Sequence, residues 1–169
     1  MTINNKLIGM GVALITPFKS DDSIDFDALG RLVEYIISNN ADYLVVCGTT
    51  AETPTLTDKE KEEIARFVVQ CNAGRLPVVL GIGGNNTKEV VEKVKTSDLT
   101  GIDAILSVTP YYNKPSQEGM IRHYSEIAKV SPVPVILYNV PTRTGVNLEA
   151  ETVAKLAWEN EKIVAVKEA

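Results

Sequence analysis

Apolar runs alternate along the chain with segments in which apolar residues recur at helical spacing. The runs cover residues 10–15, 43–46, 78–82, 104–108, 133–137 and 163–166. Most of them lack the alternation of apolar and polar residues that marks a strand with one exposed face, and they are rich in Val and Ile. Short runs of this kind are typical of strands buried on both faces, as in a parallel sheet.

The segments between these runs predict five helices, because each has a polar residue suited to cap its first turn. The predicted caps are Asp25, Thr57, Asn86, Ser116 and Asn147. Thr57 and Glu60 also form a T-x-x-E capping box. The predicted order is a βα unit repeated five times, followed by a sixth strand.

Two architectures fit strands that start about every 30 residues: a doubly wound open sheet and a (βα)₈ TIM barrel. Polar or small residues follow strands two to five, and Lys167 and Glu168 follow the sixth. An open sheet concentrates its site at one switch point, whereas a barrel spreads it over many strand ends. The pattern therefore favours the barrel.

A complete barrel needs about 250 residues. The chain of 169 residues is therefore expected to be an incomplete barrel, the N-terminal portion of a single TIM-barrel domain over residues 1–169. It would supply about five βα units plus the sixth strand. We expect a chain of this length to be inactive by itself.

Composition and charge exclude several classes of protein. With 44% apolar and 23% charged residues, the chain is too hydrophobic to be disordered. A net charge of −5 with interspersed signs argues against a nucleic-acid partner. No apolar stretch is long enough for a membrane span. The first six residues lack the features of a signal peptide, so a cytoplasmic location is expected.

Metal chemistry is also not expected. Two cysteines make neither a disulfide framework nor a zinc site, and Cys47 is predicted to be a buried thiol. The single histidine, His123, is predicted to lie on the exposed side of the fourth helix. Proton transfer would then depend on Lys, Tyr, Thr, Asp or Glu.

Lys167 is the first candidate for chemistry because it ends one of the most apolar runs in the chain. A lysine at the mouth of a buried strand is partly desolvated, which favours a neutral amine that can form a Schiff base with a ketone. The equally good alternative is a lysine that extends to solvent or pairs with Glu168.

Tyr138 ends the preceding strand and could reach Lys167, since parallel neighbours lie about 4.8 Å apart. It could also simply fill the barrel mouth.

Other candidates occupy the loops that follow the strands. Thr49 and Thr50 follow Gly48, and paired hydroxyls there suit a carboxylate or a proton relay; the alternative is a turn followed by a helix cap, which is common. Arg143 could clamp a substrate carboxylate, or be merely solvated. Tyr111 and Tyr112 suggest an interface or a substrate lid. The glycines of residues 81–84 match no nucleotide fingerprint and indicate close backbone packing.

Five motifs together resemble the dihydrodipicolinate synthases (4-hydroxy-tetrahydrodipicolinate synthases) of the pyruvate-dependent class I aldolase and lyase superfamily. They are Ala-Leu-Ile-Thr-Pro-Phe at 13–18, Gly-Thr-Thr-Ala-Glu at 48–52, Thr-Pro-Tyr-Tyr-Asn-Lys-Pro at 109–115, Tyr-Asn-Val-Pro-Thr-Arg-Thr-Gly at 138–145 and Val-Lys-Glu-Ala at 166–169. The N-acetylneuraminate lyases of the same superfamily usually have Ser at the position of Thr50 and lack an arginine matching Arg143. One departure is Ala51, where the family mostly has Gly, which takes positive φ at no cost.

The resemblance implies a cofactor-free mechanism that needs no metal. Lys167 would form an imine with pyruvate, and the enamine would attack L-aspartate-4-semialdehyde on the way to lysine and diaminopimelate. Tyr138, Thr49 and Tyr112 would relay protons, with Tyr112 reaching in from a neighbouring subunit of a homodimer or homotetramer. Thr50 would hold the pyruvate carboxylate, and Arg143 that of the semialdehyde. It also implies an L-lysine effector site; the residues that match it are Asn85, Glu89 and Tyr111.

Two other possibilities stay open. The chain could belong to another pyruvate-dependent lyase or aldolase of the superfamily. It could also be a non-catalytic, truncated piece of a barrel that holds the motifs without organising them.

Overall fold

The computed structural model describes residues 5–169 and divides them into two compact units. The first unit comprises residues 5–81 and 98–103, and the second comprises residues 82–97 and 104–169. The expectation of a single domain over residues 1–169 stays a prediction. Residues 1–4, which form most of the segment tested for a signal peptide, lie outside the described residues.

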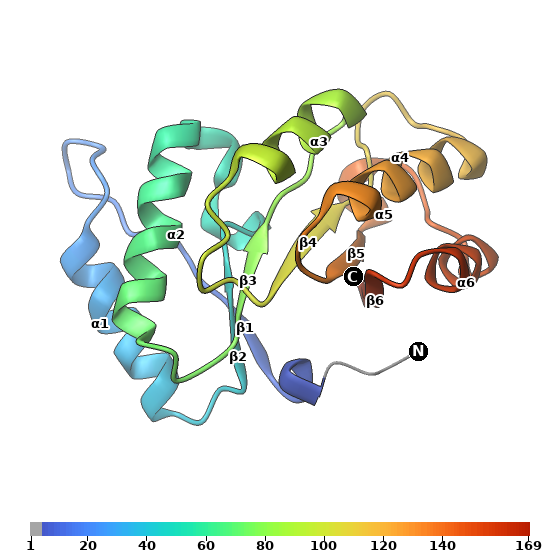
Figure 1. Cartoon of the computed structure of the whole chain (residues 1–169). Coiled ribbons are helices and arrows are strands. Elements are labelled where there is room, and N and C mark those ends of the chain that lie inside the picture. Colours follow the sequence, from blue (N-terminus) through green and yellow to red (C-terminus); the bar gives the residue numbers. More distant parts are fainter. Residues whose placement is uncertain (1–4) are drawn as a thin grey trace. The chain divides into compact units, whose positions relative to one another are not determined.

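The first unit contains three parallel strands and two long helices. Its elements are η1 (Asn5–Leu7), β1 (Gly11–Ala13), α1 (Phe26–Ser38), β2 (Tyr43–Val46), η2 (Thr49–Ala51), η3 (Thr53–Thr55), α2 (Asp58–Asn72) and β3 (Val78–Gly81). β2 pairs with both β1 and β3. α1 and α2 lie side by side (Figure 1), and the rings of Phe26 and Phe67 pack with their centroids 5.0 Å apart.

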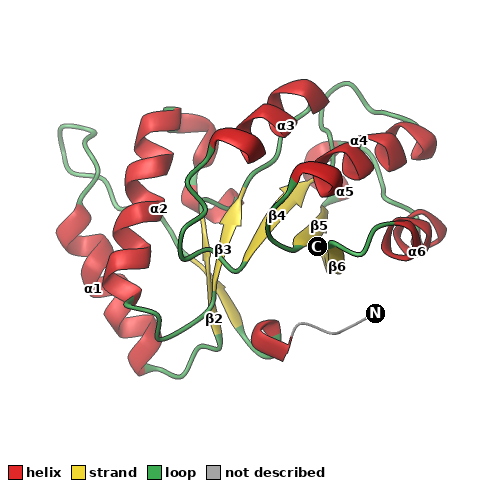
Figure 2. Ribbon diagram, in the orientation of Figure 1, coloured by secondary structure: helices red, strands yellow, loops and turns green. Residues whose placement is uncertain are grey.

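The second unit contains three further parallel strands, which are drawn in yellow in Figure 2, together with four helices. Its elements are α3 (Thr87–Thr96), β4 (Ala104–Val108), α4 (Gln117–Val130), β5 (Val135–Asn139), α5 (Pro141–Thr144), α6 (Ala150–Glu159) and β6 (Ile163–Glu168). β5 pairs with β4 and β6. α4 packs against both α3 and α6. α5 is a short helix that the apolar pattern did not predict.

The predicted caps are confirmed at four of the five helices. The side chains of Asp25, Asn86 and Ser116 accept hydrogen bonds from backbone N–H groups of the first turn, and Thr57 with Glu60 forms the capping box. The prediction for Asn147 was wrong. α6 begins later, with Glu149 at the cap position, and the Asn147 side chain instead accepts a hydrogen bond from Asn139.

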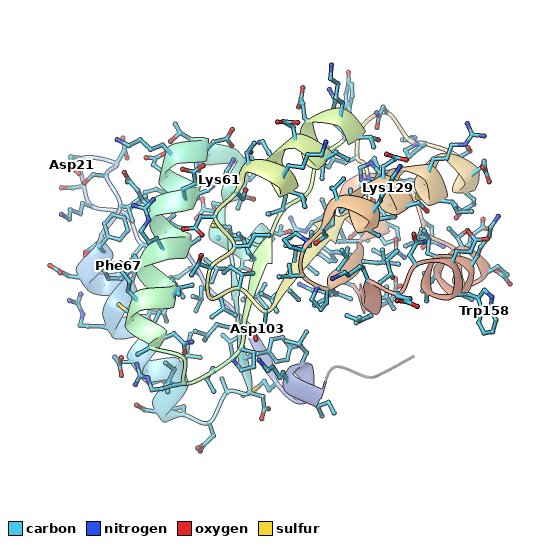
Figure 3. All side chains as sticks on the ribbon, in the orientation of Figure 1. Asp21, Lys61, Phe67, Asp103, Lys129 and Trp158 are labelled. Carbon is cyan, nitrogen blue, oxygen red and sulfur yellow. The ribbon has the colours of Figure 1, made fainter. Side chains whose placement is uncertain are left out.

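Burial follows the apolar runs most closely in the central strands of each unit. β2 and β5 are almost wholly buried, as expected for strands covered on both faces. The outer strands differ, since Gly11 of β1 and Ala165 and Val166 of β6 are exposed. Figure 3 shows Trp158 on α6, where its side chain is 91% exposed. Among the described helices, none has the length and apolar content needed to cross a membrane.

Candidate active site

Lys167 and Tyr138 lie on neighbouring strands and face each other. They are register partners in the parallel pairing of β5 with β6. The Lys167 Nζ atom lies 4.4 Å from the centroid of the Tyr138 ring. Tyr138 is only 6% exposed, and Lys167 is half-buried. An amine is therefore held against an aromatic face at a strand end, where it can meet a carbonyl compound.

This pairing depends on an irregularity in β6. Val135 pairs with Ile163, but Ile136 pairs with Ala165, so Val164 is an extra residue. Without it, Tyr138 would oppose Val166, and Lys167 would oppose the next residue of β5. Because side chains alternate between the two faces of a strand, such a shift would put Lys167 on the face opposite to Tyr138. The bulge is thus what brings the amine and the ring together.

The loop after β4 presents its tyrosines to solvent. Tyr112 is 90% exposed and has a positive φ of 71°. The Asn85 side chain donates a hydrogen bond of 3.2 Å to the Tyr111 carbonyl, and the Asn113 side chain donates one of 2.9 Å to the Asn85 carbonyl. These two bonds tie the loop to the start of α3. A bulky residue at positive φ is strained, so the loop is held in a conformation that it would not adopt freely.

Glu89 lies in the first turn of α3, near Asn85 in sequence. Its carboxylate is exposed and accepts a hydrogen bond of 2.9 Å from Asn86. The hydrogen bond between Asn85 and Tyr111 connects two of the three residues expected at an effector site. Glu89, the third of these residues, lies in the turn of α3 that Asn86 caps.

Thr49 and Thr50 belong to the first unit, where they form η2 directly after β2. Both are exposed. The Thr16 hydroxyl donates a hydrogen bond of 2.8 Å to the Ala51 carbonyl, which fastens η2 to the segment after β1. Ala51 does not have a positive φ; Cys47 and Glu52, at 52° and 55°, have it instead. Alanine is therefore compatible with this turn.

Arg143 lies in the short helix α5, and its side chain is exposed. The helix ends at Gly145, whose φ is +73°. A Cβ atom at Gly145 would lie 3.1 Å from Cε of Lys114, so the segment that carries Arg143 runs close to the tyrosine loop. The Thr144 hydroxyl donates to the carbonyls of Val140 and Val146 and stiffens this turn.

The glycines after β3 allow close backbone approach, as predicted. A Cβ atom at Gly81 would lie 2.0 Å from the Cys47 carbonyl oxygen, and one at Gly83 would lie 2.9 Å from the Val108 nitrogen. Both distances are too short for any side chain. Glycine is therefore needed at both positions for close packing of the backbone.

The prediction of a surface position for His123 was wrong, because its side chain is 3% exposed. Its Nδ1 atom is 2.8 Å from the Thr87 hydroxyl, and its ring packs edge-on against Tyr124. Nε2 has no hydrogen-bond partner among the described residues. Burial lowers the pKa of His123 to about 4. The helical pattern could not reveal this, since α4 packs against two other helices and buries more than one stripe.

Burial also favours the neutral forms of Cys47 and Tyr124. Burial raises the pKa of the Cys47 thiol to about 12, and burial also raises the pKa of Tyr124, whose hydroxyl donates to the Ser107 carbonyl. Over residues 5–169, no three His, Cys, Asp or Glu side chains gather closely enough to hold a metal ion. The described acids and thiols thus offer no ready metal centre.

The structure brings together some of the predicted site residues. It joins Lys167 to Tyr138, and it joins Asn85 to the tyrosine loop. The approach of Thr49 and Thr50 to Lys167 stays a prediction, because they lie in the other unit. Sequence reasoning did not select Asn139, whose buried side chain makes three hydrogen bonds next to this site. Its position directly after Tyr138 was the available signal.

Residues 6–169 match the dihydrodipicolinate synthetase family. The chain is 62% identical over 163 residues to 4-hydroxy-tetrahydrodipicolinate synthase of Parabacteroides distasonis, a match that covers 96% of this chain and 55% of the relative. The chain thus spans about half the length of the curated relatives that it matches.

Solved structures agree with the fold. Chloride-inhibited dihydrodipicolinate synthase from Acinetobacter baumannii, in complex with pyruvate, is 42% identical with a TM-score of 0.92, over 95% of this chain and 55% of that one. The enzyme from Cyanidioschyzon merolae with lysine bound is 42% identical with a TM-score of 0.90, over the same shares of the two chains. The predicted fold class is confirmed: the chain is an α/β protein and corresponds to an incomplete (βα)₈ barrel.

Proposed function

Since this chain belongs to the dihydrodipicolinate synthetase family, we propose that it supplies the imine-forming site of a 4-hydroxy-tetrahydrodipicolinate synthase. The observation that carries the proposal is the placement of the Lys167 amine over the Tyr138 ring, at the paired ends of β5 and β6. The match to a relative solved with pyruvate supports pyruvate as the first substrate.

The reaction begins at Lys167. Once it has lost its proton, the amine adds to the keto carbon of pyruvate, and loss of water gives an imine. Removal of a proton from the pyruvate methyl group converts the imine to an enamine. The enamine carbon then attacks the aldehyde of L-aspartate-4-semialdehyde and forms the new carbon–carbon bond. Finally, the amino group of the semialdehyde attacks the imine carbon, closes the ring and displaces Lys167.

The remaining residues handle protons and charge. Tyr138, Thr49 and Tyr112 relay the protons that imine formation and collapse require. Thr50 binds the pyruvate carboxylate, and Arg143 binds the carboxylate of the semialdehyde through its planar guanidinium. The exposure of Thr49, Thr50, Tyr112 and Arg143 is consistent with contact to substrate or to another subunit.

Assembly and regulation are part of the proposal. A Tyr112 side chain that is 90% exposed favours a homodimer or homotetramer in which it reaches a neighbouring site. The relative solved with lysine bound supports L-lysine as a ligand. In the proposal, L-lysine is an effector that Asn85, Glu89 and Tyr111 bind. The enzyme would act in the cytoplasm on the path to lysine and diaminopimelate.

Reduction with borohydride in the presence of labelled pyruvate tests the proposal. The trap is applied to this chain and to this chain followed by the C-terminal part of the Parabacteroides distasonis relative. Label on Lys167 in the joined form is the expected result. Trapping of pyruvate without consumption of L-aspartate-4-semialdehyde would favour another pyruvate-dependent lyase of the superfamily, since only the second substrate differs. No label with pyruvate in the joined form would favour a non-catalytic piece of a barrel.

A further inference from the structure

The side chain of Asn139 joins three segments at the carboxyl end of β5. Its Nδ2 group donates to Asn147 Oδ1 at 2.8 Å and to Glu168 Oε1 at 2.7 Å. Its Oδ1 atom accepts from the Leu148 N–H at 2.9 Å. Asn139 is 1% exposed, and these three bonds satisfy both ends of its amide.

The bond to Glu168 lies one residue beyond the Tyr138–Lys167 pair. Asn139 and Glu168 are themselves register partners, and the Ala169 N–H donates to the Asn139 carbonyl at 3.1 Å. Because side chains alternate along a strand, Asn139 and Glu168 lie on the opposite face from Tyr138 and Lys167. They can therefore influence the register of β5 and β6 without entering the face of the sheet that carries Lys167 and Tyr138.

This position matters because β6 has two possible registers against β5. The extra residue Val164 shifts the pairing by one, and only the shifted register puts Lys167 on the face of Tyr138. Apolar pairing does not distinguish the two registers well, since Val164, Ala165 and Val166 are small or similar in size. A specific polar pair at the strand end distinguishes them, because the unshifted register would place Lys167 opposite Asn139.

We propose that Asn139 and Glu168 are positioning residues, whose hydrogen bond selects the shifted register of β6 and so holds the Lys167 amine over Tyr138. The inference deepens the proposed function, because it concerns the placement of the same lysine. Neither residue touches the reacting atoms. They act through the backbone of β6.

Two matched substitutions of Glu168 provide the first test. Glu168→Gln keeps an acceptor oxygen for Asn139, whereas Glu168→Ala removes it. The Glu168 side chain is exposed, so neither change disturbs the core. Asn139→Asp is the reciprocal change, since it removes both donors and sets two carboxylates against each other. The pair Asn139→Asp with Glu168→Gln restores a donor and an acceptor with their roles exchanged.

The placement of Lys167 can be measured without pyruvate. In isotope-labelled protein, a nuclear Overhauser effect between the Lys167 side-chain methylene next to Nζ and the Tyr138 ring reports their contact. We expect this signal in the parent and in Glu168→Gln. It should be weaker in Glu168→Ala and absent in Asn139→Asp. In the double variant Asn139→Asp with Glu168→Gln it should return. An unchanged signal in Asn139→Asp and Glu168→Ala, with only a lower unfolding temperature, would overturn the proposal.

The rate of pyruvate trapping in the joined form gives the second readout. Loss of the register should slow labelling of Lys167 by about tenfold or more, and the double variant should recover it. Trapping at the parent rate in both disrupting variants would also overturn the proposal. If no variant traps pyruvate but the Overhauser signals follow the expected order, the positioning role stands and the proposed function fails.

Discussion

The Lys167 amine lies over the face of the Tyr138 ring, with Nζ 4.4 Å from the ring centroid. An aromatic face attracts a cationic side chain, so the ring itself helps to hold the lysine stem in place. This contact is made with the ring, whereas proton transfer requires the hydroxyl. Positioning of the amine and transfer of protons are therefore separable properties of one side chain.

Substitutions at these two residues should separate the two properties. Lys167→Ala should abolish trapping of pyruvate, because no amine remains to form the imine. Tyr138→Phe keeps the ring and should leave trapping at Lys167 intact but slower by about 10²-fold, the usual contribution of a proton donor. Mass spectrometry of borohydride-reduced protein gives both results.

Lys162→Ala is the matched control for this pair. Lys162 is exposed just before β6 and donates to the Pro132 carbonyl, so its loss should not affect trapping. Pyruvate retained on another lysine in Lys167→Ala would show that the assignment is wrong.

Gly81→Ala should destabilise the first unit severely. The added Cβ atom would lie 2.0 Å from the backbone carbonyl of Cys47, which no side-chain movement can relieve. We expect a loss of about 3 kcal/mol in the free energy of unfolding, typical of forced overpacking. Denaturant unfolding followed by circular dichroism measures it.

Gly48→Ala serves as the comparison. Gly48 has an ordinary φ of −79°, and its Cβ would make only a 3.7 Å contact with Val45. Its free energy of unfolding should change by less than about 1 kcal/mol. Equal losses in the two variants would refute the steric explanation.

Protonation of His123 should weaken the fold in mild acid. Its pKa is lowered from 6.5 to about 4 by burial, so between these values the unfolded chain binds the proton and the folded chain does not. The free energy of unfolding therefore falls as the pH falls through this window. From pH 7 to pH 5 the contribution of this group is about 2 kcal/mol.

His123→Asn removes this contribution while keeping an acceptor near the Thr87 hydroxyl. Urea unfolding at pH 7 and pH 5 should then show a smaller difference in the variant than in the parent. The same pH dependence in both proteins would mean that carboxyl groups cause it and that His123 does not.

The sequence predicted what depends on local pattern and missed what depends on packing between elements. Strand positions, four helix caps and the buried Cys47 followed from spacing and residue type. The burial of His123 did not, because it arises from helices on either side of α4. Asn147 has a good capping side chain, but Asn139 offers it a buried donor, and that contact takes precedence.

The candidate site shows the same division. The apolar run before Lys167 selected the lysine, the end of the preceding strand selected Tyr138, and the resemblance assigned a role to each. The reason that the two meet is the bulge at Val164, which no spacing of apolar residues reveals. A continuous run of small and branched residues fits either register, so the choice depends on the polar pair that follows it.

Tyr112 should act across a subunit interface. A tyrosine that is 90% exposed and held at positive φ by a bonded loop is presented for contact outside its own chain. Mixing Tyr112→Phe subunits with Lys167→Ala subunits of the joined form should give hybrid dimers with one intact site. Activity assays on purified hybrids should therefore recover part of the parent rate. Hybrids of verified composition without activity would show that Tyr112 serves its own subunit.

L-Lysine should bind near the start of α3. The Glu89 carboxylate is exposed and can pair with an ammonium group, while Tyr111, which is 43% exposed, can cover an aliphatic stem. The Asn85 side chain already bonds the Tyr111 carbonyl, so a ligand that engages Asn85 competes for the bond that holds the tyrosine loop. Lysine binding would thereby change the conformation of the loop at Tyr112, the next residue. The alternative is that Asn85 and Glu89 only begin the helix, where an early acid is favourable in any case.

Calorimetric titration of the joined form with L-lysine distinguishes these readings. We expect binding by the parent and a loss of about tenfold or more in affinity for Glu89→Ala, which removes a charged hydrogen-bond partner. Glu92→Ala, one turn further along α3, is the control for a lost acid and should bind as the parent does. Parent-like affinity of Glu89→Ala for L-lysine would show that the lysine site lies elsewhere. Absence of binding by the parent at millimolar lysine would rule out the regulation.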